Sequence, residues 1–170
     1  MIFKKNRHTN DLYITLLSLS RSIFFYKKIN LTDNFETRIY LIFIHFSIMM
    51  IIFKKKGKKF DQLHYDSLFN NIENNLREMG FGDVSVNKKM KDFNKLLYDI
   101  LLKIEKDNYN KFKINEKLIF KYFDTLKDKK NDNYNEFERY FHNFYDFCFE
   151  LSLDNMVREA RNFGNKYGCT

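Results

Sequence analysis

Few side chains in this sequence have the types and spacing that catalysis or metal binding requires. The four histidines, His8, His45, His64 and His142, are scattered and form no HExxH or other local metal-ligand pattern. No GxSxG or P-loop motif occurs, and no cysteine has a nearby general base. We therefore expect no enzyme: no catalytic residues, no cofactor, no metal and no small-molecule substrate.

Two glycines, Gly80 and Gly82, could form a loop that cradles phosphate. No predicted strand precedes them, however, and no third glycine follows, as a dinucleotide-binding loop would require. The pattern favours a helix that ends at Gly80, followed by a tight turn into the next helix.

His45 is one of only two strongly polar residues, with Ser47, in the apolar run from Ile39 to Phe53. The first interpretation is a core histidine that donates a hydrogen bond to a neighbouring carbonyl or side chain, because a buried polar group must be satisfied. The second is a place on a partner-binding face, where an imidazole beside apolar surface would orient the partner. The sequence leaves both open.

A basic run, KKKGKK, follows the apolar run. It is either a solvated helix end or an electrostatic anchor to an anionic membrane surface. Its lysines are Lys54, Lys55, Lys56, Lys58 and Lys59.

The elements that position these residues are predicted to be helices throughout. The chain has no proline and only five glycines, and no segment alternates like a strand. Apolar spacing predicts up to seven helices. The first spans about 11–27, the second runs from a cap at Thr32 or Asp33 to near Gly57, the third spans 60–79, and the fourth runs from a cap at Ser85 to about 105. The last three lie around 118–126, around 134–151, and from 154 to about 167.

The second of these helices organises the rest. Its apolar run would rise only about 22 Å, less than the roughly 30 Å of a bilayer core, so we expect a buried core helix. A helix that is apolar on all sides must be covered on all sides. The sequence thus predicts an all-α, single-domain bundle of six or seven helices around a buried apolar second helix, with residues 9–168 as the domain and 1–8 as a basic flexible arm.

Positive charge is concentrated in the first third of the 170-residue chain. The net charge is +8; residues 1–60 carry +9 and residues 61–170 carry −1. This asymmetry suits an anionic membrane surface or nucleic acid. Cys148 and Cys169, with no evident secretory signal, predict free thiols in a reducing compartment.

Several short segments in order resemble one known family. They are Leu12-Tyr13, Ser20-Arg21, Phe25-Tyr26, DNFETR at 33–38, IHFSIMMIIFKKKG at 44–57 and LFNNIENNLREMGFGDVSVNKKMK at 68–91. Over residues 12 to about 101 the chain resembles the ubiquinol-cytochrome c chaperone family, helical proteins that act in assembly of the cytochrome bc1 complex. Where the family usually has Phe-Tyr-Gly-Arg, this chain has Leu97-Tyr98-Asp99-Ile100.

The resemblance implies a non-enzymatic assembly chaperone that binds newly made cytochrome b. It implies a peripheral protein on the cytoplasmic face of a bacterial inner membrane, or on the matrix side in mitochondria, with the ribosome or a small partner subunit as further partners. We expect the client in a groove beside the second helix. The alternative, suggested by the basic first third, is a helical module that binds RNA or the ribosome.

Residues that match the family pattern are the candidates for partner contact. They are Asp33, Arg38, His45, Arg77, Asp83, Lys88 and Lys91. Each also has a structural alternative: Asp33 as a helix cap, Arg38 as its ion-pair partner, and Arg77 with Asp83 as a latch across the Gly80 turn.

Overall fold

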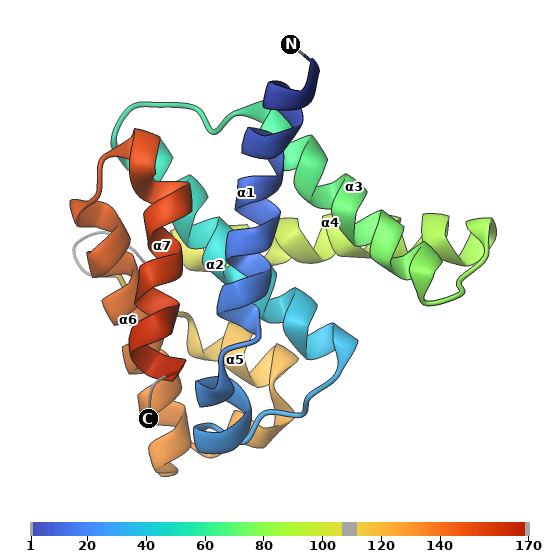
Figure 1. Cartoon of the computed structure of the whole chain (residues 1–170). Helices are drawn as coiled ribbons and strands as arrows, with labels where there is room; N and C mark the ends of the chain where they lie inside the picture. Colours follow the sequence, from blue (N-terminus) through green and yellow to red (C-terminus); the bar gives the residue numbers. More distant parts are fainter. Residues whose placement is uncertain (1, 107–111, 169–170) are drawn as a thin grey trace.

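The computed structural model describes residues 2–106 and 112–168. Within those ranges the chain forms seven α-helices, a π-helical turn and a 3-10 turn, and no strand (Figure 1). In order they are α1 (Ile2–Ser20), η1 (Phe24–Lys28), α2 (Phe35–Lys55), α3 (Gln62–Glu78), α4 (Asp83–Lys106), α5 (Glu116–Tyr122), η2 (Asp124–Leu126), α6 (Asp132–Glu150) and α7 (Leu153–Gly168). The predicted all-α fold is confirmed.

Helix α2 is the centre of the bundle. It packs against α1, α4, α6 and α7, and its side chains from Leu41 to Met49 are all buried. By length and composition alone it could cross a membrane, and in the described residues no other helix could, but 72% of its most apolar window is buried inside the protein. The prediction of a buried apolar second helix is therefore confirmed.

Both ends of α2 have recognisable caps. At the start, the side chain of Asn34 accepts a hydrogen bond from the backbone N–H of Thr37 at 2.8 Å, so the cap predicted at Thr32 or Asp33 is wrong by one or two residues. At the end, Gly57 has φ +75°, and the N–H of Lys58 donates to the carbonyl of Phe53 at 3.0 Å. This is a Schellman motif, which needs the left-handed conformation that glycine adopts readily.

Helix α1 differs from its prediction at both ends. It begins at Ile2 and therefore takes in residues 2–8, the predicted basic arm, whose flexibility stays a prediction. It ends at Ser20, where the hydroxyl of Tyr26 donates to the carbonyl of Ser20 at 2.6 Å and satisfies a group that the helix end leaves without an internal donor. The predicted single helix to residue 27 is thus divided into α1 and η1.

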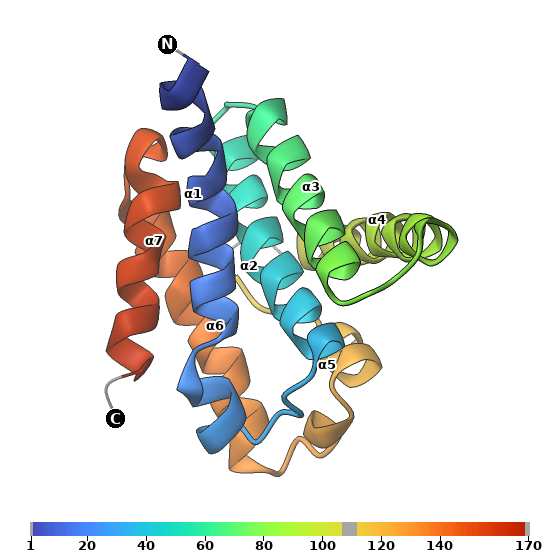
Figure 2. The same ribbon diagram turned by 45° about the vertical axis from the view of Figure 1, so that its right-hand side comes forward.

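Helices α3 and α4 form a hairpin whose turn projects away from α6 and α7 (Figures 1 and 2). Gly80 has φ +93°, its N–H bonds to the carbonyl of Arg77, and the N–H of Phe81 bonds to that of Leu76. The prediction of a helix cap at Gly80 is confirmed. Helix α4 begins at Asp83, two residues before the cap predicted at Ser85.

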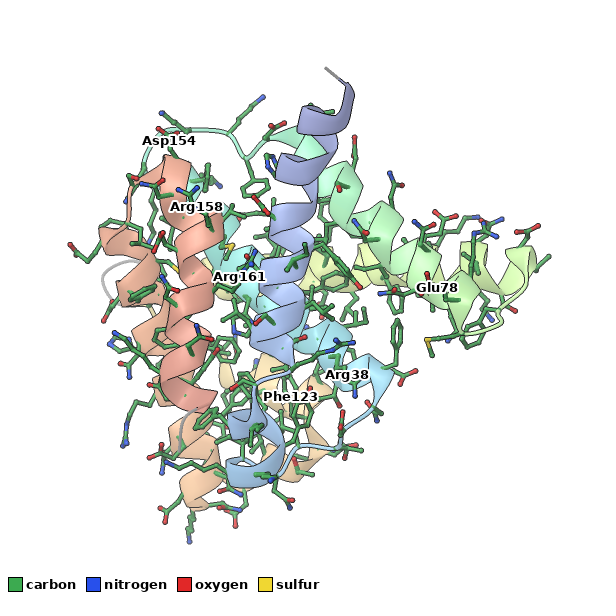
Figure 3. All side chains as sticks on the ribbon, viewed as in Figure 1. Arg38, Glu78, Phe123, Asp154, Arg158 and Arg161 are labelled. Atoms are coloured by element: carbon green, nitrogen blue, oxygen red, sulfur yellow. The ribbon has the colours of Figure 1, made fainter. Side chains whose placement is uncertain are left out.

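The C-terminal helices complete the core. Helix α7 lies along both α1 and α6, and Arg161 Nε donates to Thr15 Oγ1 at 3.1 Å (Figures 1 and 3). Gly164 allows this approach, since a Cβ atom there would lie 3.0 Å from Leu19. Cys148 is buried on α6 and free, while Cys169 lies outside the described residues.

Candidate functional site

A groove of about 510 Å³ lies beside α2, between α1 and α3. Helix α1 packs against both α2 and α3, and α1 and α3 diverge toward the end of α3 (Figures 1 and 2), so one side of α2 is incompletely covered there. The groove is lined by Tyr13, Leu17, Arg21, Phe35, Arg38, Ile39, Ile42, Ile72, Asn75, Glu78 and Met79. It is therefore a concave surface of the kind predicted beside the second helix.

Apolar side chains from all three helices make most of the groove. Ile39 and Ile72 are buried in its floor, while Leu17 and Phe35 are half-buried in its walls. Met79, just after α3, is 54% exposed. It places an unbranched, adaptable thioether at the edge of the groove.

Charged groups stand at the border of this apolar surface. Arg38 Nη2 donates to Asp33 Oδ1 at 2.6 Å, which confirms the predicted ion pair and raises the pKa of Arg38. Arg21 at the end of α1 and Glu78 at the end of α3 are exposed. Figure 3 shows Arg38 and Glu78 on different helices, and both line the groove. An apolar floor with charged borders is suited to a peptide segment that is apolar in its middle and polar at its ends.

The second pair of candidate residues lies at the α3–α4 turn, beyond the groove. Arg77 is hydrogen-bonded to Asp83 and, at 2.9 Å, to Glu73, so the predicted latch across the Gly80 turn is confirmed. Lys88 and Lys91 lie on α4 and are exposed. The structure therefore brings Arg38 to the groove but places Arg77, Asp83 and the two lysines on the hairpin.

His45 occupies neither place, because it is fully buried. Its Nδ1 lies 2.6 Å from the carbonyl oxygen of Leu41, and its Nε2 lies 2.9 Å from the hydroxyl of Tyr140 on α6. A carbonyl can only accept, so Nδ1 carries the proton and Nε2 accepts from Tyr140. Burial lowers the pKa of His45 to about 3. Of its two proposed roles, the structure supports the core histidine.

The five lysines after the apolar run divide into two groups. Lys54 pairs with Glu105, Lys55 Nζ lies 3.0 Å from the hydroxyl of Tyr145, and Lys56 Nζ donates to the carbonyl of Leu151 at 2.8 Å. These three hold the end of α2 to α4 and α6. Lys58 and Lys59 are exposed, and a role for the run at a membrane stays a prediction.

Within the described ranges no group of three or more His, Cys, Asp or Glu side chains is placed to hold a metal ion. The groove lining offers one carboxylate, two guanidinium groups and one amide, and the amide of Asn75 is hydrogen-bonded to the hydroxyl of Tyr13. This arrangement can bind and orient an apolar chain.

Sequence reasoning missed most of the groove. Tyr13, Leu17 and Phe35 belong to the general apolar pattern of their helices, so periodicity alone assigns them to the core. Only the angle between α1 and α3 leaves them accessible. A weak signal was present in Arg21, an exposed cation directly after an apolar helix.

Comparison with known proteins gives one finding. Residues 27–108 match the family model for the ubiquinol-cytochrome C chaperone. No curated protein and no solved structure matches the chain. The matched segment contains α2, α3, α4 and all of the charged candidates, but neither α1 nor the C-terminal helices. The resemblance found in the sequence is thus confirmed over residues 27–108, where the chain is similar to the ubiquinol-cytochrome C chaperone family.

Proposed function

We propose that the chain is a non-enzymatic assembly chaperone for the ubiquinol–cytochrome c reductase (bc1) complex, with newly made cytochrome b as its client. The observation that carries the proposal is an apolar groove on α2 and α3, inside the segment that matches the chaperone family. Cytochrome b is a membrane protein, so an unassembled segment needs cover for its apolar surface.

The groove is suited to hold rather than convert its client. Ile39, Ile42 and Ile72 offer apolar area, and Arg21 and Arg38 offer cations at one border. The client segment is an apolar helix or strand with an acidic or carboxylate-bearing end near Arg21 and Arg38. Release then requires only that a better partner, such as a mature subunit, covers the same segment.

The proposed place of action is the inner membrane surface, on the cytoplasmic side in a bacterium or the matrix side in a mitochondrion. There the client is inserted, and a peripheral protein can reach it. The ribosome and a small partner subunit are the further partners in this proposal.

The test is cross-linking of the tagged chain in its native cells, with a photoreactive residue at Met79. A matched control carries the same residue at Leu63, which is also 54% exposed and lies on α3 outside the groove. We expect cytochrome b to be cross-linked from position 79 and at least several-fold less from position 63.

Substitution at the same position provides a second test of the client site. Met79→Asp places a charge at the edge of the groove and should reduce cytochrome b recovery about tenfold, because burying an unpaired carboxylate under the client costs on the order of several kcal/mol. Leu63→Asp, outside the groove, should leave the recovery unchanged. Ribosomal RNA and ribosomal proteins recovered without cytochrome b would overturn the chaperone proposal in favour of the RNA-binding alternative. Equal effects at 79 and 63 would show that the groove is not the client site.

A further inference from the structure

The solvent-facing side of α4 carries an unexpected row of side chains. Its members follow one another at intervals of four and three residues, so they share one helix face. We call it the α4 stripe; it consists of Val84, Lys88, Lys91, Lys95, Tyr98 and Leu102. Three lysines in the middle are thus flanked by apolar side chains at both ends.

The apolar members of the stripe are unusually exposed. Val84 is 85% exposed, Tyr98 61% and Leu102 56%. They are not required for the core, because the opposite face of α4, from Val86 to Ile104, supplies the buried residues. Figure 2 views α4 nearly along its axis, with the bundle on one side of the helix only. Single exposed apolar side chains are common on protein surfaces, but these three share one helix face with three lysines.

The charges around the stripe favour an anionic partner. Asp99 is bound by Lys103 at 2.6 Å and by Lys121 at 2.8 Å, and Glu105 is bound by Lys54. Asp83 is likewise bound by Arg77. These three carboxylates, which would repel an anionic surface, are therefore neutralised within the protein.

The three lysines of the stripe do not neutralise carboxylates of the protein. In the described parts of the chain, Lys88, Lys91 and Lys95 make no ion pair, and all three are exposed. Asp92 is the carboxylate beside them that has no cationic partner there. The stripe therefore keeps a net positive charge directed outward.

We propose that the α4 stripe docks the protein on an anionic lipid bilayer. The three lysines contact lipid phosphates, while Val84, Tyr98 and Leu102 enter the boundary between headgroups and acyl chains. A helix with basic and apolar side chains on one face binds membranes in this way, and a tyrosine is well suited to the interface. The inference rests on the proposed function in one respect, because it gives the peripheral chaperone its membrane-facing side.

A lipid surface explains the stripe better than RNA does. Lysines alone would serve either partner, because both present phosphates. Exposed valine and leucine add nothing to a phosphate backbone, and single-strand binding requires several aromatic platforms, whereas the stripe has one tyrosine. The aliphatic ends are therefore the discriminating observation.

The position of the stripe is consistent with the groove. Val84 lies four residues after Gly80, and Met79, at the edge of the groove, directly precedes Gly80. The stripe thus begins beside one end of the groove. A membrane under α4 would bring that end close to a client that is still in the bilayer.

The test measures partitioning of the full chain onto vesicles of phosphatidylcholine, with and without phosphatidylglycerol. We expect binding only with the anionic lipid. The triple variant Lys88→Gln, Lys91→Gln, Lys95→Gln should bind about 100-fold more weakly, since each lysine near an anionic surface contributes about fivefold. The control Lys27→Gln, Lys130→Gln, Lys166→Gln removes the same charge from exposed lysines elsewhere and should change binding less than about fivefold.

A second variant removes apolar area without changing charge. Val84→Ser with Leu102→Ser should weaken vesicle binding about fivefold and leave its salt dependence unchanged, because only the hydrophobic contribution is lost. All substituted positions are exposed, so unchanged circular dichroism and thermal unfolding are expected.

Three results would overturn the proposal. The first is an equal loss of vesicle binding in both lysine triples, and the second is no loss with the serine variant. The third is that the chain binds single-stranded RNA more tightly than anionic vesicles and that the stripe lysine triple loses RNA binding as much as vesicle binding. The stripe variants should still recover cytochrome b in detergent, where no bilayer is needed. Met79→Asp should lose the client and keep vesicle binding, so the two proposals fail separately.

Discussion

His45 shows how one polar side chain is accommodated in the most apolar part of the molecule. Its imidazole links α2 to α6 through the hydroxyl of Tyr140 and is surrounded by aromatic rings, among them Phe141 and Phe144, each with a centroid 4.8 Å away. A neutral ring is satisfied by one donor and one acceptor, and both partners are present. The residue therefore specifies how α2 and α6 meet.

The first prediction follows from its lowered pKa. The folded state keeps the ring neutral down to about pH 3, whereas the unfolded chain binds a proton near the ordinary value of 6.5. The unfolded state thus binds more protons between these values, so the free energy of unfolding falls as the pH falls through this window. The contribution of His45 is up to about 1.4 kcal/mol per pH unit.

Chemical denaturation between pH 4 and 7 measures this slope. The variant His45→Gln should lose about 1–3 kcal/mol at pH 7 and show a smaller slope than the native chain, because the titrating group is gone. Tyr140→Phe is the control: it removes the hydroxyl but keeps the buried imidazole, so the slope should persist. Identical slopes in the native chain and in His45→Gln would contradict the interpretation.

At the scale of elements, Asp99 explains a departure from the family pattern. It stands in α4 where the family usually has glycine, and it binds Lys103, Lys121 and the hydroxyl of Tyr122. Burial works to raise the pKa of Asp99, but these hydrogen bonds outweigh it and lower the pKa. Two of its partners belong to α5, which lies outside the matched residues 27–108. The carboxylate thus joins the family segment to the rest of the chain.

The second prediction concerns this junction. Asp99→Asn removes the charge that attracts both lysines, so α5 should be held less firmly on α4, with a loss of about 1 kcal/mol. Hydrogen exchange of the backbone amides of residues 116–122 should become several-fold faster. Asp92→Asn is the matched control, since Asp92 is exposed on the same helix. Equal exchange in both variants would show that α5 is held by apolar packing alone.

At the scale of the whole molecule, the family segment covers only part of the core. Helix α2 within it is covered by α1 on one side and by α6 and α7 on another, and all three lie outside residues 27–108. Without them, His45 would lose Tyr140, Phe141 and Phe144, and its side of α2 would face water. We therefore expect the unit that folds to be larger than the matched segment.

The third prediction is that a fragment of residues 27–108 does not fold on its own. Exposure of one side of α2 leaves too little buried apolar surface to offset the conformational entropy of its chain. Such a fragment should bind a hydrophobic dye, lack near-ultraviolet circular dichroism and unfold without a cooperative transition. The full chain under the same conditions is the control. Cooperative unfolding of the fragment would contradict the prediction.

Much of this protein was determined by the sequence alone. The absence of proline, the apolar spacing and the run from Ile39 to Phe53 were enough for an all-α bundle around the second helix, because these depend on local backbone preference and on a face that must be buried. Gly80 was identified as a cap for the same local reason. The charged pairs Asp33 with Arg38 and Arg77 with Asp83 were found because their members are five and six residues apart.

What lies far apart in sequence was decided by the tertiary structure. Tyr140 is 95 residues from His45, so no pattern could predict that this hydroxyl would satisfy the buried ring. The groove exists because α1 and α3 diverge over α2, and that angle results from packing across the whole bundle. The apolar spacing of α4 predicts its buried face but not the α4 stripe, and only the structure showed that Val84, Tyr98 and Leu102 face away from the core. Local interactions are encoded in neighbouring residues, whereas accessibility depends on where every other helix lies.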